Sequence, residues 1–191
     1  MNKTAKKSTD AKEIIHVALV LMIICAAVAF ILSFVNMVTR DRIAENEEAE
    51  KKNAIEALFA GESIEYSALD IESDAVNAIY EVKDDAGRLG YAVSVSPSGF
   101  GGNIDMMVGI DTDGKITGVR IVSLSETPGL GSRVADDDFL SAFVGKSGSV
   151  ELGRDADVIS GSTISSKAVV LGVNNALTAL GEYLTGGSAI K

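Results

Sequence analysis

The 191-residue sequence has almost none of the thiol and imidazole side chains that hold structural zinc, haem or iron–sulfur clusters. It contains one cysteine, Cys25, one histidine, His16, and no tryptophan. Structural zinc needs Cys and His ligands, iron–sulfur clusters need several thiolates, and haem usually takes an axial His or Cys. Ser-His-Asp and Cys-His catalysis also require a histidine. Because both residues lie in a long apolar run near the N-terminus, any redox carrier in the rest of the chain must be organic.

This apolar run covers residues 14–36 and contains no Asp, Glu, Lys or Arg. A helix of about 20 residues crosses the ~30 Å hydrocarbon core of a bilayer, so the run is long enough to span it. A cleaved signal peptide is the alternative, but its apolar part has only about 7–15 residues and ends at a small-residue cleavage site, which this run lacks. We therefore predict a retained, single-pass transmembrane helix over residues 14–36.

Charge differs on the two sides of the run. Residues 1–13 contain four lysines and two acidic residues, whereas Arg40 and Arg42 are followed by a glutamate-rich stretch. Basic residues near a spanning helix favour the cytoplasmic side, so we predict a cytoplasmic N-terminus at 1–13 and an extracytoplasmic C-terminal part, in the cell (inner) membrane. The net charge is −10, and −12 without residues 1–13. Such an acidic domain repels nucleic acid, which we do not expect as a partner.

The sequence beyond the run changes from helical to strand patterning. Residues 37–60 are polar and helix-favouring, which predicts a helical stalk. Alternating apolar residues separated by Asp- and Gly-rich turns predict two hairpins, with strands over 78–82, 91–95, 104–110 and 116–122. A short helix over 136–144, a short strand over 157–160 and a long helix over 165–183 complete the pattern. We therefore predict an α+β domain over residues 61–191, with antiparallel strands and helices packed on one side.

Hydroxyl side chains cluster where the short strand should meet the long helix. Five of the seven residues at 160–166 carry a hydroxyl, and Gly161 permits a tight turn among them; the five are Ser160, Ser162, Thr163, Ser165 and Ser166. A helix N-terminus favours phosphate through its unpaired N–H groups and its dipole. Ordinary N-capping also uses Ser or Thr, although one cap needs only one hydroxyl. The pattern alone leaves both interpretations open.

Two other segments are rich in glycine. Residues 126–131 read Glu-Thr-Pro-Gly-Leu-Gly, and residues 97–102 read Pro-Ser-Gly-Phe-Gly-Gly. Proline and glycine together form rigid turns whose backbone can approach a flat ligand closely. Without further information, each segment could equally be a plain surface turn.

Together these segments resemble the FMN-binding domain family. The family's flavinylation motif is Asp-x-x-Ser/Thr-Gly-Ala-Thr/Ser, and Asp157, Ser160, Gly161 and Thr163 match it, with Ser162 in place of the usual alanine. The resemblance implies that a flavin transferase, with FAD as donor, attaches FMN to Thr163 through a phosphoester. It also implies an extracytoplasmic FMN-binding domain whose cofactor-binding residues are Ser160, Gly161, Ser162, Ser165 and Ser166 around the attachment point, Glu126, Thr127, Gly129, Leu130 and Gly131 against the isoalloxazine ring, and Gly101 in a turn near the flavin.

From the apolar run to about Leu184, the sequence most resembles the G-subunit family of Rnf ion-translocating electron transport complexes. This resemblance implies an electron-relay flavoprotein in a membrane complex that moves electrons between ferredoxin and NAD⁺, coupled to sodium or proton translocation. The other Rnf subunits would be its partners, and the chain would have no metal site and no substrate turnover of its own. Three alternatives stay open: a part similar to the C subunit of a sodium-pumping NADH:quinone reductase, a stand-alone anchored flavoprotein for extracellular electron transfer, and a non-redox scaffold.

Overall fold

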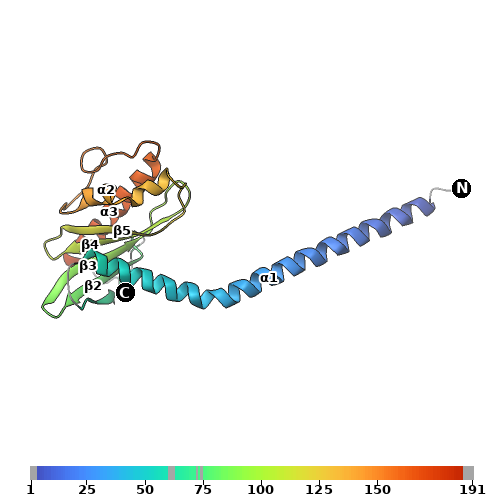
Figure 1. Ribbon diagram of the computed structural model, residues 1–191, viewed down its shortest axis with the longest axis horizontal. Helices are drawn as coiled ribbons and strands as arrows, with labels where there is room; N and C mark the ends of the chain where they lie inside the picture. Colours follow the sequence, from blue (N-terminus) through green and yellow to red (C-terminus); the bar gives the residue numbers. More distant parts are fainter. Residues whose placement is uncertain (1–3, 60–62, 72, 74, 187–191) are drawn as a thin grey trace. The chain divides into compact units, whose positions relative to one another are not determined.

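The computed structural model describes residues 4–59, 63–71, 73 and 75–186. Its elements, in chain order, are α1 (Thr4–Leu58), β1 (Glu65–Leu69), β2 (Ala78–Asp84), β3 (Gly87–Val95), β4 (Ile104–Asp111), β5 (Ile116–Leu124), the 3-10 turn η1 (Gly131–Ala135), α2 (Asp137–Leu140), the 3-10 turn η2 (Ser141–Phe143) and α3 (Thr163–Leu184) (Figure 1). The chain divides into two compact units, with the boundary between Glu48 and Ala49. The outer ends of the predicted segments, at 1–3, 60–62 and 187–191, lie outside the described residues.

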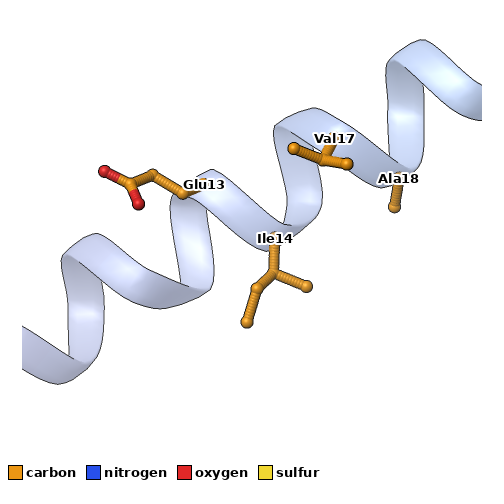
Figure 2. A pocket seen from close by; sticks show the side chains of 4 residues that line it. All are labelled: Glu13, Ile14, Val17 and Ala18. Carbon is orange, nitrogen blue, oxygen red and sulfur yellow. The ribbon is translucent and has the colours of Figure 1, made fainter.

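The first unit is the part of α1 that ends at Glu48. Within it, Lys12–Arg40 is the one segment of the described chain that is long and apolar enough to cross a membrane, and its large apolar side chains are exposed. A depression lined by Glu13, Ile14, Val17 and Ala18 lies on this helix (Figure 2). All four side chains come from one helix, so the depression has no second wall and is not a candidate binding site.

The second unit is built on a five-stranded antiparallel sheet in the order β1-β2-β3-β4-β5. The two predicted hairpins are confirmed as β2–β3 and β4–β5. We did not predict β1, which pairs with β2 from Glu65 opposite Lys83 to Leu69 opposite Ile79. Its five residues, Glu-Tyr-Ser-Ala-Leu, are at most half-buried. This edge strand therefore depends on pairing with its neighbour more than on an apolar pattern of its own.

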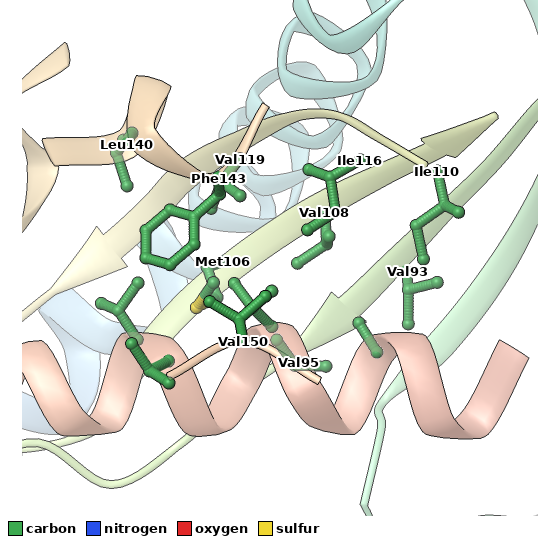
Figure 3. Packing of buried hydrophobic residues seen from close by; sticks show 14 of the residues in the cluster. Val93, Val95, Met106, Val108, Ile110, Ile116, Val119, Leu140, Phe143 and Val150 are labelled. Carbon is green, nitrogen blue, oxygen red and sulfur yellow. The ribbon is translucent and has the colours of Figure 1, made fainter. Parts of the chain in front are cut away.

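Apolar residues cover both faces of this sheet, whereas we had expected helices on one side only. Figure 3 shows the face that packs on α3, with Val95, Met106 and Val108 between the sheet and the helix and Phe143 beside them. The opposite face packs against the last turns of α1, and this second cluster consists of Ala54, Ile55, Leu58, Phe59, Val82, Ala92 and Met107. The end of the predicted stalk is therefore part of the domain's core.

The chain between β5 and α3 differs from the prediction in two places. The predicted short strand over 157–160 is absent, and only an isolated bridge between Leu152 and Ala156 precedes it. Residues 157–160 line a cleft with η1 and α2, which offer no free strand edge to pair with. The predicted helix over 136–144 is present as α2 followed by η2. The last helix begins at Thr163, two residues before the predicted start.

Candidate functional site

The hydroxyl cluster at the start of α3 separates into exposed and buried side chains. Ser160 and Thr163 are exposed, whereas Ser162, Ser165 and Ser166 retain only 3%, 2% and 0% of their accessible surface. A helix that packs on one face buries positions three to four residues apart, and here 162, 165, 166 and 169 are buried. Thr163, the first helical residue, lies outside this set and is exposed.

No side chain caps α3 at its N-terminus. Ser162 occupies the N-cap position with φ −126° and ψ 33°, and its hydroxyl makes no capping hydrogen bond. Among the described residues, Ser162 Oγ and Ser166 Oγ are buried without any hydrogen-bond partner. Ordinary N-capping therefore does not account for the cluster. The first-turn N–H groups of α3 have no side-chain acceptor, which suits a helix terminus that receives a phosphate.

Glu126 joins three segments that are distant in sequence. Its side chain is 6% exposed. The Oε1 atom accepts hydrogen bonds from the backbone N–H groups of Phe100, at 2.7 Å, and Gly101, at 3.2 Å. The Oε2 atom accepts one from Ser165 Oγ, at 3.0 Å. A buried carboxylate needs such donors because its desolvation is otherwise uncompensated. The glycine-rich turn, the 126–131 loop and the first turn of α3 thus meet at one side chain.

Glycines provide the space for this carboxylate. A Cβ atom added to Gly99 would overlap Glu126 Oε1, and one added to Gly131 would overlap Glu126 Oε2. A Cβ on Gly101 would overlap the carbonyl oxygen of Ser125. Close packing, rather than an unusual backbone conformation, therefore requires glycine at these three positions.

Leu130 connects the 126–131 loop to the flavinylation motif. Gly161 has φ +81°, and a Cβ atom there would lie 2.9 Å from Leu130 Cδ1, so the leucine packs directly over the glycine. The Leu130 side chain remains 46% exposed, and Thr127 and Gly129 of the same loop are also exposed. Phe100 is 72% exposed in the neighbouring turn. We had not singled out Phe100, although an aromatic residue within a glycine-rich turn was a usable signal.

A cleft of about 390 Å³ lies beside the motif, and its lining residues are Arg133, Asp136, Asp138, Phe139, Ala142, Asp157, Val158, Ile159 and Ser160. Its size is within the range of small-molecule sites. The charged lining residues are three aspartates and one arginine, Arg133, whose Nε atom lies 3.8 Å from Oδ2 of Asp136. No group of three or more His, Cys, Asp or Glu in the described part of the chain is arranged to hold a metal ion. An acidic lining repels phosphate, which the N-terminus of α3 accommodates better.

The loop before the motif is held by Asp155. Its carboxylate accepts a hydrogen bond from Glu151 N–H at 2.9 Å and pairs with Arg154 at 2.8 Å and Lys146 at 3.1 Å. The pKa of the Asp155 carboxyl is lowered to about 2. The hydrogen bond from Glu151 N–H is the largest cause, followed by the hydrogen bonds from the side chains of Arg154 and Lys146. These interactions hold the chain in place just before residues 157–163.

Comparison with known proteins adds support from related sequences. Residues 99–178 match the FMN-binding domain family, and this range contains every candidate site residue; residues 1–58 match the RnfG N-terminal region. The G subunit of a Na(+)-translocating ferredoxin:NAD(+) oxidoreductase complex from Acetobacterium woodii is 32% identical, over 91% of this chain and 95% of that relative. The G subunit of an ion-translocating oxidoreductase complex from Methanosarcina acetivorans is 30% identical, over 88% and 95%.

One solved structure supports the fold. The crystal structure of the C subunit of the Na(+)-translocating NADH-quinone reductase from Parabacteroides distasonis aligns with a TM-score of 0.50 and 26% identity. The alignment covers 57% of this chain and 63% of that one, a little under two thirds. The predicted α+β class, with an N-terminal apolar helix and an antiparallel sheet packed by helices, is thereby confirmed.

Proposed function

Since this chain belongs to the G-subunit family of ion-translocating oxidoreductase complexes and contains an FMN-binding domain, we propose that it carries FMN covalently on Thr163 and relays electrons within such a complex. The observation that carries the proposal is the exposed Thr163 hydroxyl at the first position of α3, where the helix lacks a side-chain cap. The flavin supplies one- and two-electron transfer when bound.

The exposure of the hydroxyls supports Thr163 over its neighbours as the attachment point. Ser162, Ser165 and Ser166 are buried, so a transferase approaching from solvent reaches only Ser160 and Thr163. Of these two, Thr163 lies within the helix, next to its free N–H groups. A phosphate on Thr163 therefore remains beside the donors and the positive end of the helix dipole, whereas one on Ser160 lies on the acidic cleft.

The attachment step is a transfer without a change of oxidation state. Thr163 Oγ1 forms a bond to the phosphorus of the FMN half of FAD, and the phosphoanhydride bond to AMP breaks. AMP leaves, and the hydroxyl proton passes to solvent. The covalent bond matters because the part of the chain beyond residues 1–13 has a net charge of −12 and offers a free phosphate little long-range attraction.

We place the chain in the membrane through residues 14–36, with residues 1–13 in the cytoplasm. The stalk over 37–60 and the FMN-binding domain over 61–191 lie on the outer side, where the last turns of the stalk pack into the domain's core. The exposed apolar surface of Lys12–Arg40 supports this placement, because such a surface is stable in lipid and not in water. The name of the Acetobacterium woodii relative gives ferredoxin and NAD(+) as its electron carriers. We propose the same pair here, reached through the other subunits of the complex.

Flavin fluorescence on a denaturing gel tests the attachment. The full chain is produced together with a flavin transferase, and the wild-type band should fluoresce because a phosphoester survives denaturation. Thr163→Ala should remove the emission and Thr163→Ser should retain it. Thr178→Ala, which deletes an exposed hydroxyl on α3 outside the motif, is the matched control and should fluoresce as the wild type does. Emission from the Thr163→Ala band, or equal loss of emission in Thr178→Ala, would contradict the assignment.

A further inference from the structure

We infer that Glu126 is a positioning residue for flavin attachment, which holds the glycine-rich turn and the first turn of α3 in place around Thr163. The inference rests on the proposed function of Thr163, but it assigns a different role to Glu126 from the one suggested by the motif alone. The motif places this residue against the flavin ring, whereas its carboxylate is buried and faces the protein.

The hydrogen bonds of Glu126 join segments far apart in the chain. Its partners Phe100 and Gly101 precede it by 26 and 25 residues, and Ser165 follows it by 39. The three segments also touch through packing, with Gly101 against Ser125 and Leu130 over Gly161, but these contacts are less directional than hydrogen bonds. One buried carboxylate on the loop accepts hydrogen bonds from both other segments and so holds the three together.

Two glycines leave room for the Glu126 carboxylate. A Cβ atom on Gly99 would overlap Oε1 and one on Gly131 would overlap Oε2, so a side chain at either position would displace the carboxylate. The two glycines therefore leave the carboxylate room at the point where it accepts its hydrogen bonds. Its two oxygens are held in one orientation, with Oε1 on the turn and Oε2 on the helix.

The hydrogen bond that holds Ser165 also determines the direction in which the Thr163 side chain points. Thr163, Ser162 and Ser165 belong to the same helical turn, so the hydrogen bond from Ser165 Oγ sets how that turn is rotated about its axis. Leu130, four residues after Glu126, packs over Gly161, two residues before Thr163. Because misplacement by about 1 Å can slow a group transfer by about 100-fold, loss of this anchor should reduce attachment even where the fold survives.

Three substitutions separate positioning from general stability. Glu126→Gln keeps the shape, since one amide oxygen can accept from the two N–H groups and the amide nitrogen can donate to Ser165 Oγ. Glu126→Ala leaves three donors unpaired. The matched control is Asn174→Ala, because Asn174 also anchors a loop by two hydrogen bonds, to Val150 N at 2.8 Å and Val150 O at 2.9 Å. Asn174 lies eleven residues beyond Thr163 on α3, about 16 Å along the helix.

Amide hydrogen exchange on the flavin-free full chain in detergent tests the anchor itself. The Phe100 and Gly101 amides should exchange slowly in the wild type and in Glu126→Gln, and about tenfold faster or more in Glu126→Ala. Asn174→Ala should leave these two amides unchanged. Equal protection of both amides in Glu126→Ala and the wild type would overturn the inference.

The rate of flavin attachment, with purified transferase and FAD, tests the consequence. Glu126→Ala should attach flavin about tenfold more slowly or worse, whereas Glu126→Gln and Asn174→Ala should stay within about threefold of the wild type. If Glu126→Ala does not fold, Ser165→Ala, which removes one of the three hydrogen bonds, should slow attachment about threefold or more. A wild-type rate in the alanine variants, or equal slowing in Asn174→Ala, would refute positioning. Absence of attachment in the wild type itself would instead refute the proposed function.

Discussion

Replacement of the three buried serines at the start of α3 by alanine should change the stability of the domain in opposite directions: upward for Ser162 and Ser166, and downward for Ser165. Ser162 Oγ and Ser166 Oγ have no hydrogen-bond partner although their residues are at most 3% exposed. Removal of either hydroxyl therefore relieves a desolvation penalty that nothing offsets. Ser165 Oγ donates to Glu126, and its removal leaves a buried carboxylate oxygen without that donor.

The expected magnitudes follow from these contacts. A buried hydroxyl without a partner costs about 1–3 kcal/mol, so Ser162→Ala and Ser166→Ala should each raise the free energy of unfolding by about 1 kcal/mol. A hydrogen bond to a charged group contributes about 1.5–3 kcal/mol, so Ser165→Ala should lower it by about 2 kcal/mol. If Ser162 were an ordinary N-cap, its replacement by alanine would instead cost about 1 kcal/mol. The sign of the Ser162→Ala effect therefore decides between the two interpretations.

Urea unfolding of the flavin-free full chain in detergent, followed by tyrosine fluorescence, measures these changes. The sequence has no tryptophan, and its four tyrosines, Tyr66, Tyr80, Tyr91 and Tyr183, all lie in the unit that begins at Ala49. The signal thus reports the sheet domain and not the apolar helix. Ser160→Ala, at an exposed position, is the control and should change stability by less than about 0.5 kcal/mol. Destabilisation of Ser162→Ala to the same extent as Ser165→Ala would refute the reasoning.

Two further predictions concern backbone conformation and pH. Gly161→Ala should lower the free energy of unfolding by about 1–2 kcal/mol because of the positive φ at this position, and by a further amount because the added Cβ meets Leu130. Gly153, at φ +87° with open space around it, is the control, and Gly153→Ala should show only the effect of φ in the same urea assay. The pKa of Asp155 is lowered from 3.8 to about 2, so its contribution to stability is complete above about pH 4 and is lost as the pH falls through about 2. The urea midpoint of the wild type should therefore fall more steeply over this interval than that of Asp155→Asn, and parallel curves would contradict the pairing of Asp155.

The sheet was predictable where alternation and turn residues agreed. Residues 78–82 and 91–95 alternate around a turn with an aspartate and a glycine, and they form β2 and β3. The apolar residues of β1 are too few to predict a strand without its neighbour. The strand predicted over 157–160 failed because the tertiary surroundings offer those residues η1 and α2 rather than a strand edge. Local pattern therefore sufficed for the hairpins but not for segments decided by their neighbours.

The residues proposed for the candidate site stand out in the sequence, but their arrangement does not. The motif around Thr163 and the loop around Glu126 are both visible in the sequence, yet no local pattern indicates that Glu126 bonds to residues 25 and 39 positions away. The start of α3 at Thr163, which makes the buried Ser162 its N-cap residue, was also not predicted. Long-range hydrogen bonds and helix boundaries are the features that sequence periodicity determines least well.

Mass spectrometry of the peptide that contains Thr163 tests the central claim most directly. The protein is isolated from its native membrane, where the transferase is active, and digested without reduction of the flavin. We predict a peptide that carries one FMN, with the fragment ions assigning the added mass to Thr163 and leaving Ser160 and Ser162 unmodified. An unmodified peptide, or FMN on either serine, would contradict the account.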